Sequence, residues 1–120
     1  MSRESDEELI NAARTAAESS YAPYSGFHVG AALRSTDGTI FPGTNVENRS
    51  YGLAICAERS ALVSAVTAGH GSFGEIAIFS PDAEYPVPPC GACRQVLSEF
   101  MAPQARVIFV ARDGATSEHT

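Results

Sequence analysis

The three cysteines of this chain restrict its fold more than any other feature. Cys56 stands alone, whereas Cys90 and Cys93 form a Cys-x-x-Cys pair much later in the sequence. Three thiolates can bind one zinc ion and leave its fourth position open for water, which is the arrangement of a catalytic zinc site. Glu58 follows Cys56 by two residues and is placed to move the protons of that water. The fold must therefore bring two distant segments together, and the pattern indicates an enzyme.

Two other interpretations of the cysteines are a structural zinc site and three buried thiols in the core. A structural zinc site normally has four protein ligands. The chain has no fourth cysteine, and its histidines (His28, His70 and His119) are not near the cysteines in sequence. A zinc site with an open position is therefore the favoured interpretation.

Composition predicts a globular protein with one domain over residues 1–120. Hydrophobic residues make up 44% of the chain and charged residues 18%, and 120 residues are enough to bury a core. The net charge of −6, with only 8 Lys and Arg, argues against a nucleic-acid polymer as partner. No apolar run reaches the roughly 20 residues of a membrane span, and no secretory signal is visible. An odd number of cysteines suits a reducing cytoplasm.

Hydrophobic periodicity and turn residues predict a three-layer α-β-α fold around a mixed sheet. The expected order is α-β-β-α-β-α-β, with a helix over about 6–20, strands 29–33 and 40–46, a helix over 56–68, a strand 75–79, a helix from about 90 to a stop near 103, and a strand 106–111. The first two strands should form an antiparallel hairpin around Asp37-Gly38. The other connections contain helices, so strands two, three and four should run parallel. The tail after residue 111 is polar, and no further strand is predicted there.

The expected helices place all three thiols at helix amino ends. Cys56 begins one helix, and Cys90 and Cys93 lie in the first turn of another. Free backbone N–H groups and the helix dipole lower the pKa of a thiol there. Three thiolates leave excess negative charge, which Arg59 and Arg94 are placed to offset. We expect Arg59 to hydrogen-bond the ligand sulfurs; the alternative is that both arginines are ordinary surface charges.

Several segments of the chain match one enzyme family in register. They are Tyr21-Ala22-Pro23-Tyr24-Ser25, Phe27-His28-Val29-Gly30-Ala31-Ala32, Gly43-Thr44-Asn45-Val46-Glu47-Asn48, Ser50-Tyr51-Gly52-Leu53, Cys56-Ala57-Glu58-Arg59 and Pro89-Cys90-Gly91-Ala92-Cys93-Arg94-Gln95. With these segments the chain resembles the small homotetrameric, zinc-dependent cytidine deaminases of pyrimidine salvage, and the resemblance covers nearly its whole length. In zinc deaminases of this type a glutamate that is not a ligand moves the protons.

The resemblance implies a reaction and a cofactor. The chain would hydrolyse cytidine and 2′-deoxycytidine to uridine, or 2′-deoxyuridine, and ammonia through a zinc-bound hydroxide. Cys56, Cys90 and Cys93 would bind one zinc ion per chain, and Glu58 would be the proton shuttle. Arg59 and Gln95 would lie around the metal ligands.

The resemblance also implies the groups that hold the nucleoside. Phe27 would pack against the pyrimidine ring, and the backbone of Ala57 would touch the base. Asn45 and Glu47 would hydrogen-bond the ribose 3′-hydroxyl, and Tyr51 would reach the site of a neighbouring subunit. The alternatives are that Phe27 is a core residue and that the two polar side chains are an ordinary strand end.

Two features differ from the family pattern, and two other functions remain open. Arg49 stands where the family has a small residue, and the sequence ends at residue 120 without the late aromatic that closes a neighbour's site in the family. The chain is alternatively a deaminase of another aminopyrimidine such as blasticidin S, or a zinc-stabilised protein without catalysis.

Overall fold

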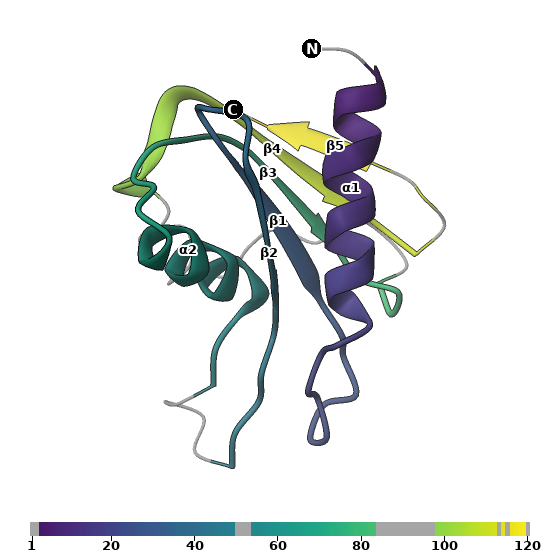
Figure 1. The fold of residues 1–120 in the computed structure, drawn as a ribbon. Helices are drawn as coiled ribbons and strands as arrows, with labels where there is room; N and C mark the ends of the chain where they lie inside the picture. Colours follow the sequence, from purple (N-terminus) through teal and green to yellow (C-terminus); the bar gives the residue numbers. More distant parts are fainter. Residues whose placement is uncertain (1–2, 50–53, 84–97, 113, 115, 120) are drawn as a thin grey trace.

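The protein is described from a computed structural model, which covers residues 3–49, 54–83, 98–112, 114 and 116–119. Two helices and five strands occur in this part of the chain (Figure 1). They are α1 (Arg3–Ala17), β1 (Gly30–Ser35), β2 (Ile40–Thr44), α2 (Ala57–Thr67), β3 (Phe73–Phe79), β4 (Met101–Val110) and β5 (Thr116–His119). None of the helices in the described ranges is long and apolar enough to cross a bilayer.

The strands form one mixed sheet in the order β2-β1-β3-β4-β5. β1 is antiparallel to both β2 and β3, β3 is parallel to β4, and β4 is antiparallel to β5. β2, β3 and β4 therefore run in the same direction, as the sequence predicts, although β1 separates β2 from β3. β2 is an outer strand, and Pro42 at its centre pairs with Ala32 of β1.

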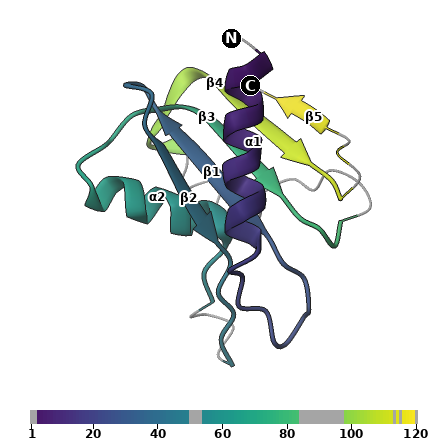
Figure 2. The ribbon, with the colours of Figure 1, turned by 45° about the vertical axis from the view of Figure 1, so that its right-hand side comes forward.

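The two helices cover opposite faces of the sheet, which confirms the three-layer architecture (Figures 1 and 2). Strand side chains alternate between the faces. The face under α2 buries the cluster Ala31, Leu33, Ala57, Ala61, Leu62, Ala65, Phe73, Ile76, Ile78 and Phe109. The face under α1 buries the cluster Leu9, Ala13, Ala17, Ala32, Ala77, Phe79, Ile108 and Val110.

Glycine allows each helix to approach the sheet closely. A Cβ atom on Gly43 of β2 would lie 2.2 Å from the Ala61 backbone nitrogen in α2, and a Cβ on Gly30 of β1 would lie 1.9 Å from the Ala13 carbonyl oxygen in α1. Such distances are far below van der Waals contact. The missing side chain of Gly43 therefore sets the distance between α2 and the sheet, and with it the position of the helix's amino end.

The turn between β1 and β2 is held by one carboxylate. Asp37 accepts hydrogen bonds from the Ser35 hydroxyl and from the Thr39 backbone N–H, the latter at 3.0 Å. The Ser35 hydrogen bond, followed by those from Thr39, lowers the pKa of Asp37 from 3.8 to about 2. Gly38 supplies the positive φ of +98° that this turn requires. The predicted hairpin is confirmed, and its turn lies at the end of β1 away from Gly30.

Other predicted elements differ from the structure. α1 spans Arg3–Ala17 rather than about 6–20. The helix expected from about 90 lies largely in 84–97, outside the described residues. The chain is already in a turn at Glu99 and Phe100 and enters β4 at Met101, so the expected continuation to about 103 is wrong. The reason is pairing with β3: the Phe73 N–H donates to the Phe100 carbonyl, and Met101 pairs with Phe73.

The polar tail forms a strand that the sequence did not predict. β5 pairs with β4 from Val110 and Thr116 to Val107 and His119. Backbone hydrogen bonds carry this pairing, so it needs no alternation of apolar side chains. An outer strand of this kind leaves little signal in the sequence.

Candidate active site

A cavity of about 190 Å³ lies at one end of the strands of the sheet. It is lined by Phe27, Val29, Asn45, Cys56, Ala57, Glu58, Ile78, Ser80, Ala83 and Val110. β2, β3 and β4 all end there, and β1 begins there. The carboxyl ends of parallel strands are the usual location of ligand sites in such sheets. The cavity therefore lies where the topology brings loops from across the sequence together.

The amino end of α2 supplies the reactive groups of the cavity. Cys56 is the N-cap residue, with extended backbone at φ −76° and ψ 155°, and its side chain makes no capping hydrogen bond. The first backbone N–H groups of a helix and its dipole favour a thiolate at this position. Glu58, in the first turn, is only 5% exposed. A buried carboxylate beside a cavity and next to a thiol is a typical mark of a functional site.

Arg59 places a cation beside the Cys56 thiol. Its Nη2 lies 4.0 Å from the Cys56 sulfur and donates to the Ala54 carbonyl oxygen at 3.2 Å. The residue is half-buried, in contrast to a solvated surface charge. A guanidinium at this position favours the thiolate form of Cys56 electrostatically.

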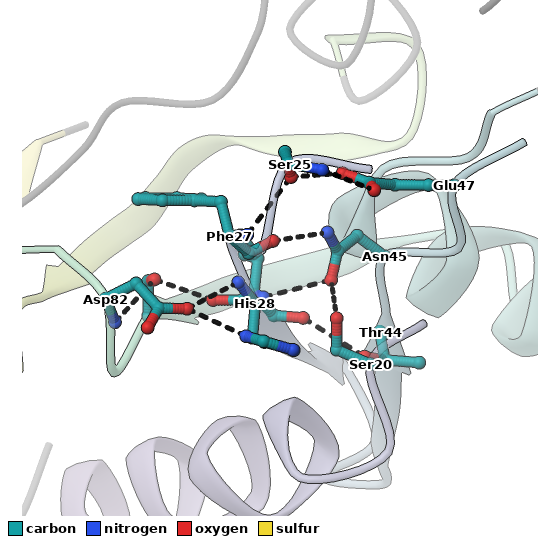
Figure 3. Close-up of polar contacts among 10 residues, drawn as sticks. Ser20, Ser25, Phe27, His28, Thr44, Asn45, Glu47 and Asp82 are labelled. Atoms are coloured by element: carbon teal, nitrogen blue, oxygen red, sulfur yellow. Dashed lines mark hydrogen bonds and ion pairs between the residues drawn. The ribbon is translucent and has the colours of Figure 1, made fainter. Parts of the chain in front are cut away.

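The side-chain amide of Asn45 joins three segments at the wall of the cavity (Figure 3). Its Oδ1 accepts hydrogen bonds from the Ser20 hydroxyl and from the Val29 N–H, the latter at 2.9 Å. Its Nδ2 donates to the Phe27 carbonyl at 2.9 Å. These bonds hold the backbone on both sides of His28. Among the described residues, the second Nδ2 hydrogen of Asn45 has no acceptor, so it is available to a ligand.

Glu47 lies beside the cavity but is not among the residues that line it. Its Oε1 accepts hydrogen bonds from the backbone N–H groups of Tyr24 at 3.0 Å and Ser25 at 3.1 Å, and its Oε2 accepts from the Ser25 hydroxyl (Figure 3). The Ser25 hydroxyl bond is the main cause of a lowered pKa at Glu47. Glu47 therefore stays ionised and orders the loop that leads to Phe27.

Part of the sequence-predicted site lies outside the described residues, namely Tyr51, Cys90, Cys93, Arg94 and Gln95. Accordingly, no group of three His, Cys, Asp or Glu side chains that could hold a metal is found among the residues that the structure does describe. The residues that it does describe fit a zinc site, because a thiol at a helix amino end and a buried carboxylate line one cavity, and a guanidinium lies 4.0 Å from the sulfur.

Two of the histidines pair with carboxylates rather than with Cys56. The Nδ1 of His28 lies 2.9 Å from Asp82, and the Nδ1 of His70 lies 3.5 Å from Asp37. Neither of the two is among the residues that line the cavity.

The segment that follows β3 was not predicted to contribute to the site. Ser80 and Ala83 line the cavity, and Asp82 pairs with His28. The sequence showed only a proline-containing loop here. Its one usable signal was position, since Ser80 directly follows a predicted strand at the carboxyl edge of the sheet.

Comparisons with known proteins agree with this geometry. Residues 3–111 match the family model described as the cytidine and deoxycytidylate deaminase zinc-binding region. A cytidine deaminase of Sporosarcina psychrophila is 52% identical over 94 residues, which cover 78% of this chain and 68% of the relative. A cytidine deaminase of Halalkalibacterium halodurans is 46% identical over 112 residues, 93% of this chain and 84% of the relative. The crystal structure of cytidine deaminase from Burkholderia pseudomallei, 47% identical, superposes with a TM-score of 0.91 over 100% of this chain and 93% of that one.

Proposed function

Because the chain belongs to the cytidine and deoxycytidylate deaminases that share a zinc-binding region, we propose that it hydrolyses cytidine and 2′-deoxycytidine. Water replaces the amino group at C4 of the base, so that uridine or 2′-deoxyuridine and ammonia are released. Zinc is the cofactor of this family's matched region. The observation that carries the proposal is the cavity in which Cys56, Glu58 and Phe27 meet.

Cys56, together with Cys90 and Cys93, would hold one zinc ion per chain. When bound, zinc lowers the pKa of water and supplies hydroxide near neutral pH. Arg59 offsets the negative charge of the thiolates, as its 4.0 Å approach to the Cys56 sulfur suggests. Gln95 would support the ligands from the other segment.

Glu58 would move the two protons that the reaction needs. It first accepts a proton from the attacking water and gives it to N3 of the base, which makes C4 more electrophilic. After the water oxygen has added to C4, Glu58 would take the remaining proton from the new C4 hydroxyl and give it to the amino group; the C4=O bond forms as the C4–N bond breaks and ammonia leaves. Burial of Glu58 beside the cavity, at 5% exposure, keeps bulk water from competing for these transfers.

The cavity wall would bind the nucleoside. Phe27 packs against the pyrimidine ring, and the Ala57 backbone touches the base. Asn45 offers its remaining amide hydrogen to the ribose 3′-hydroxyl. A carboxylate can accept about four hydrogen bonds, so Glu47 still has capacity for the same hydroxyl beside the three that it already accepts.

We also propose that the enzyme is a cytoplasmic, single-domain homotetramer of pyrimidine salvage, with Tyr51 reaching a neighbouring subunit's site. Exposed apolar side chains that an assembly would cover support self-association: Val46 is 42% exposed, Ile55 46%, Val63 61% and Val66 43%. The net charge of −6 supports a small nucleoside rather than a nucleic-acid polymer as substrate.

Loss of the cytidine absorbance band tests the proposal. Zinc-loaded protein is incubated separately with cytidine, 2′-deoxycytidine and blasticidin S, beside Glu58→Gln. We expect turnover of both nucleosides, and a loss of about 10²- to 10⁴-fold in Glu58→Gln with one zinc per chain retained. Glu8→Gln, which neutralises a side chain that is 71% exposed, is the control and should keep full activity.

Other outcomes would redirect the proposal. Turnover of blasticidin S alone would indicate a deaminase of another aminopyrimidine. No ammonia from any substrate, in protein shown to hold zinc, would indicate a zinc-stabilised protein without catalysis. Near-normal activity in Glu58→Gln would refute the role of Glu58.

A further inference from the structure

A closed set of hydrogen bonds joins the loop before β1 to the loop after β3. The backbone N–H of His28 donates to Asp82 Oδ2 at 2.7 Å, and the ring Nδ1 lies 2.9 Å from the same oxygen. The Ser80 hydroxyl donates to the His28 carbonyl at 2.6 Å and accepts from the Asp82 N–H at 3.2 Å. We call this set the His28–Asp82 clamp, and Figure 3 labels two of its residues, His28 and Asp82. It consists of His28, Ser80 and Asp82.

The clamp lies at the wall of the cavity: Ser80 lines it, and His28 and Asp82 lie next to residues that line it. Phe27 and Val29, on either side of His28, line the cavity, as do Ser80 and Ala83 on either side of Asp82. The segment from residue 22 to residue 29 contains no helix or strand; the Gly26 N–H closes a turn by donating to the Ala22 carbonyl at 3.0 Å, whereas residues 27–29 depend largely on contacts with other parts of the chain. Asn45 holds this segment from the side of β2, and the clamp holds it from the side of β3.

The carboxylate of Asp82 carries the clamp. The backbone hydrogen bond from His28, and then the bond from its ring, lower the pKa of Asp82. Asp82 is therefore ionised at neutral pH and accepts both bonds as a charged group. The His28 and Asp82 side chains are 41% and 38% exposed, so the pair adds little to global stability. Its effect is local, on the segment that contains Phe27.

We propose that His28 and Asp82 are positioning residues, which hold Phe27 where it packs on the pyrimidine ring. This inference rests on the proposed function of the cavity. If the segment is in its binding position in only a fraction of the molecules, the apparent affinity for the substrate falls in proportion to that fraction. The chemistry of the bound substrate is unchanged. Loss of the clamp should therefore raise KM and leave kcat nearly constant.

The experiment measures KM and kcat for cytidine together with hydrogen exchange of the amides of residues 27–29. Asp82→Ala removes both bonds from His28, and we expect KM to rise about three- to tenfold with faster exchange at these amides. His28→Asn places an amide nitrogen where Nδ1 lies and should keep KM near the wild-type value. His28→Gln places its nitrogen further out and should raise KM.

Asp37→Ala is the matched control. It also removes the carboxylate partner of a histidine, His70, but in the turn between β1 and β2, away from the cavity. It should lower stability without changing KM. This separates an effect on the cavity wall from a general loss of structure.

Each outcome decides the inference. The inference is supported if KM rises with constant kcat in Asp82→Ala and His28→Gln, and if KM stays near the wild-type value in His28→Asn. An unchanged KM, or a fall in kcat alone, overturns it. If the wild-type protein deaminates no nucleoside, the proposed function fails instead. Hydrogen exchange alone then decides whether the clamp orders residues 27–29. Unchanged amide exchange in Asp82→Ala would refute this ordering.

Discussion

Glu75 is a buried carboxylate held by two arginines, and its removal should cost considerable stability. It is 6% exposed and accepts hydrogen bonds at 2.8 Å from both Arg34 and Arg106. Arg106 also binds Asp6 of α1 through two contacts of 3.1 Å. Arg34 lies 4.0 Å from Glu8, whose side chain is 71% exposed. Glu75 therefore joins β1, β3, β4 and α1 through its two arginines.

The size of the loss follows from these contacts. Removing one partner of a buried ion pair costs about 3–5 kcal/mol, because the other charge stays buried. After Glu75→Ala, Arg106 keeps its two contacts to Asp6, and Arg34 keeps its 4.0 Å approach to Glu8. We therefore expect the lower end of the range, about 3 kcal/mol. Glu75→Gln keeps the shape and an acceptor and should cost about 2 kcal/mol.

Urea unfolding followed by circular dichroism measures this loss, at fixed protein and zinc concentrations because both change apparent stability. With a slope of about 2 kcal/mol per molar urea, Glu75→Ala should lower the midpoint by about 1.5 M. Glu8→Gln, at the exposed contact, should shift it by less than about 0.3 M. Activity at 25 °C should not change, because Glu75 is near the start of β3 and the cavity is at its end. A midpoint shift in Glu75→Ala no larger than that in Glu8→Gln would refute the reasoning.

Three further predictions concern acid stability, packing and the metal. Side-chain hydrogen bonds are the main reason why the folded-state pKa of Asp6 lies below 3.8 and that of Asp37 at about 2. Both groups therefore contribute stability above about pH 4, and this stability is lost as the pH falls towards 2. Asp37→Asn should make the loss shallower in acid unfolding curves. Gly43→Ala places a Cβ 2.2 Å from the α2 backbone, so α2 must move; we expect a loss of about 1–3 kcal/mol in urea unfolding and reduced activity, whereas unchanged melting and kinetics would contradict the close packing. Arg59→Met removes the cation 4.0 Å from the Cys56 sulfur and should weaken zinc binding about 10- to 100-fold in competition with a chelator, while equal affinity would show that this guanidinium does not support the ligand.

The parts of the fold that the sequence predicts are those with a strong local pattern. Alternating apolar residues and Asp37-Gly38 define the hairpin, and helical periodicity with Gly69 after it defines α2. The beginning of β4 and the whole of β5 depend on backbone pairing with strands elsewhere in the chain. No local pattern of side chains records such pairing, so the helix predicted to reach about 103 was extended too far.

The same distinction between local pattern and long-range contact applies to the site. Cys56 and Glu58 were predicted from residue type and spacing, and the structure places both at one cavity. Asp82 and Ser80 were not predicted, because their partner His28 is more than fifty positions away in sequence and meets them only through the pairing of β1 with β3. Glu47 was expected beside the ribose, and its contacts to the Tyr24–Ser25 loop became visible only in three dimensions.

Pro42 in the outer strand β2 has a consequence for self-association. An outer strand normally offers a row of N–H and C=O groups that another chain can extend into an intermolecular sheet. Proline has no N–H, so the row on β2 is interrupted at its centre, opposite Ala32. Proline is also excluded from the short segments that seed amyloid. Among the described strands, β2 is therefore an outer strand with an interrupted template for intermolecular pairing, and it ends at the side of the sheet where the cavity lies.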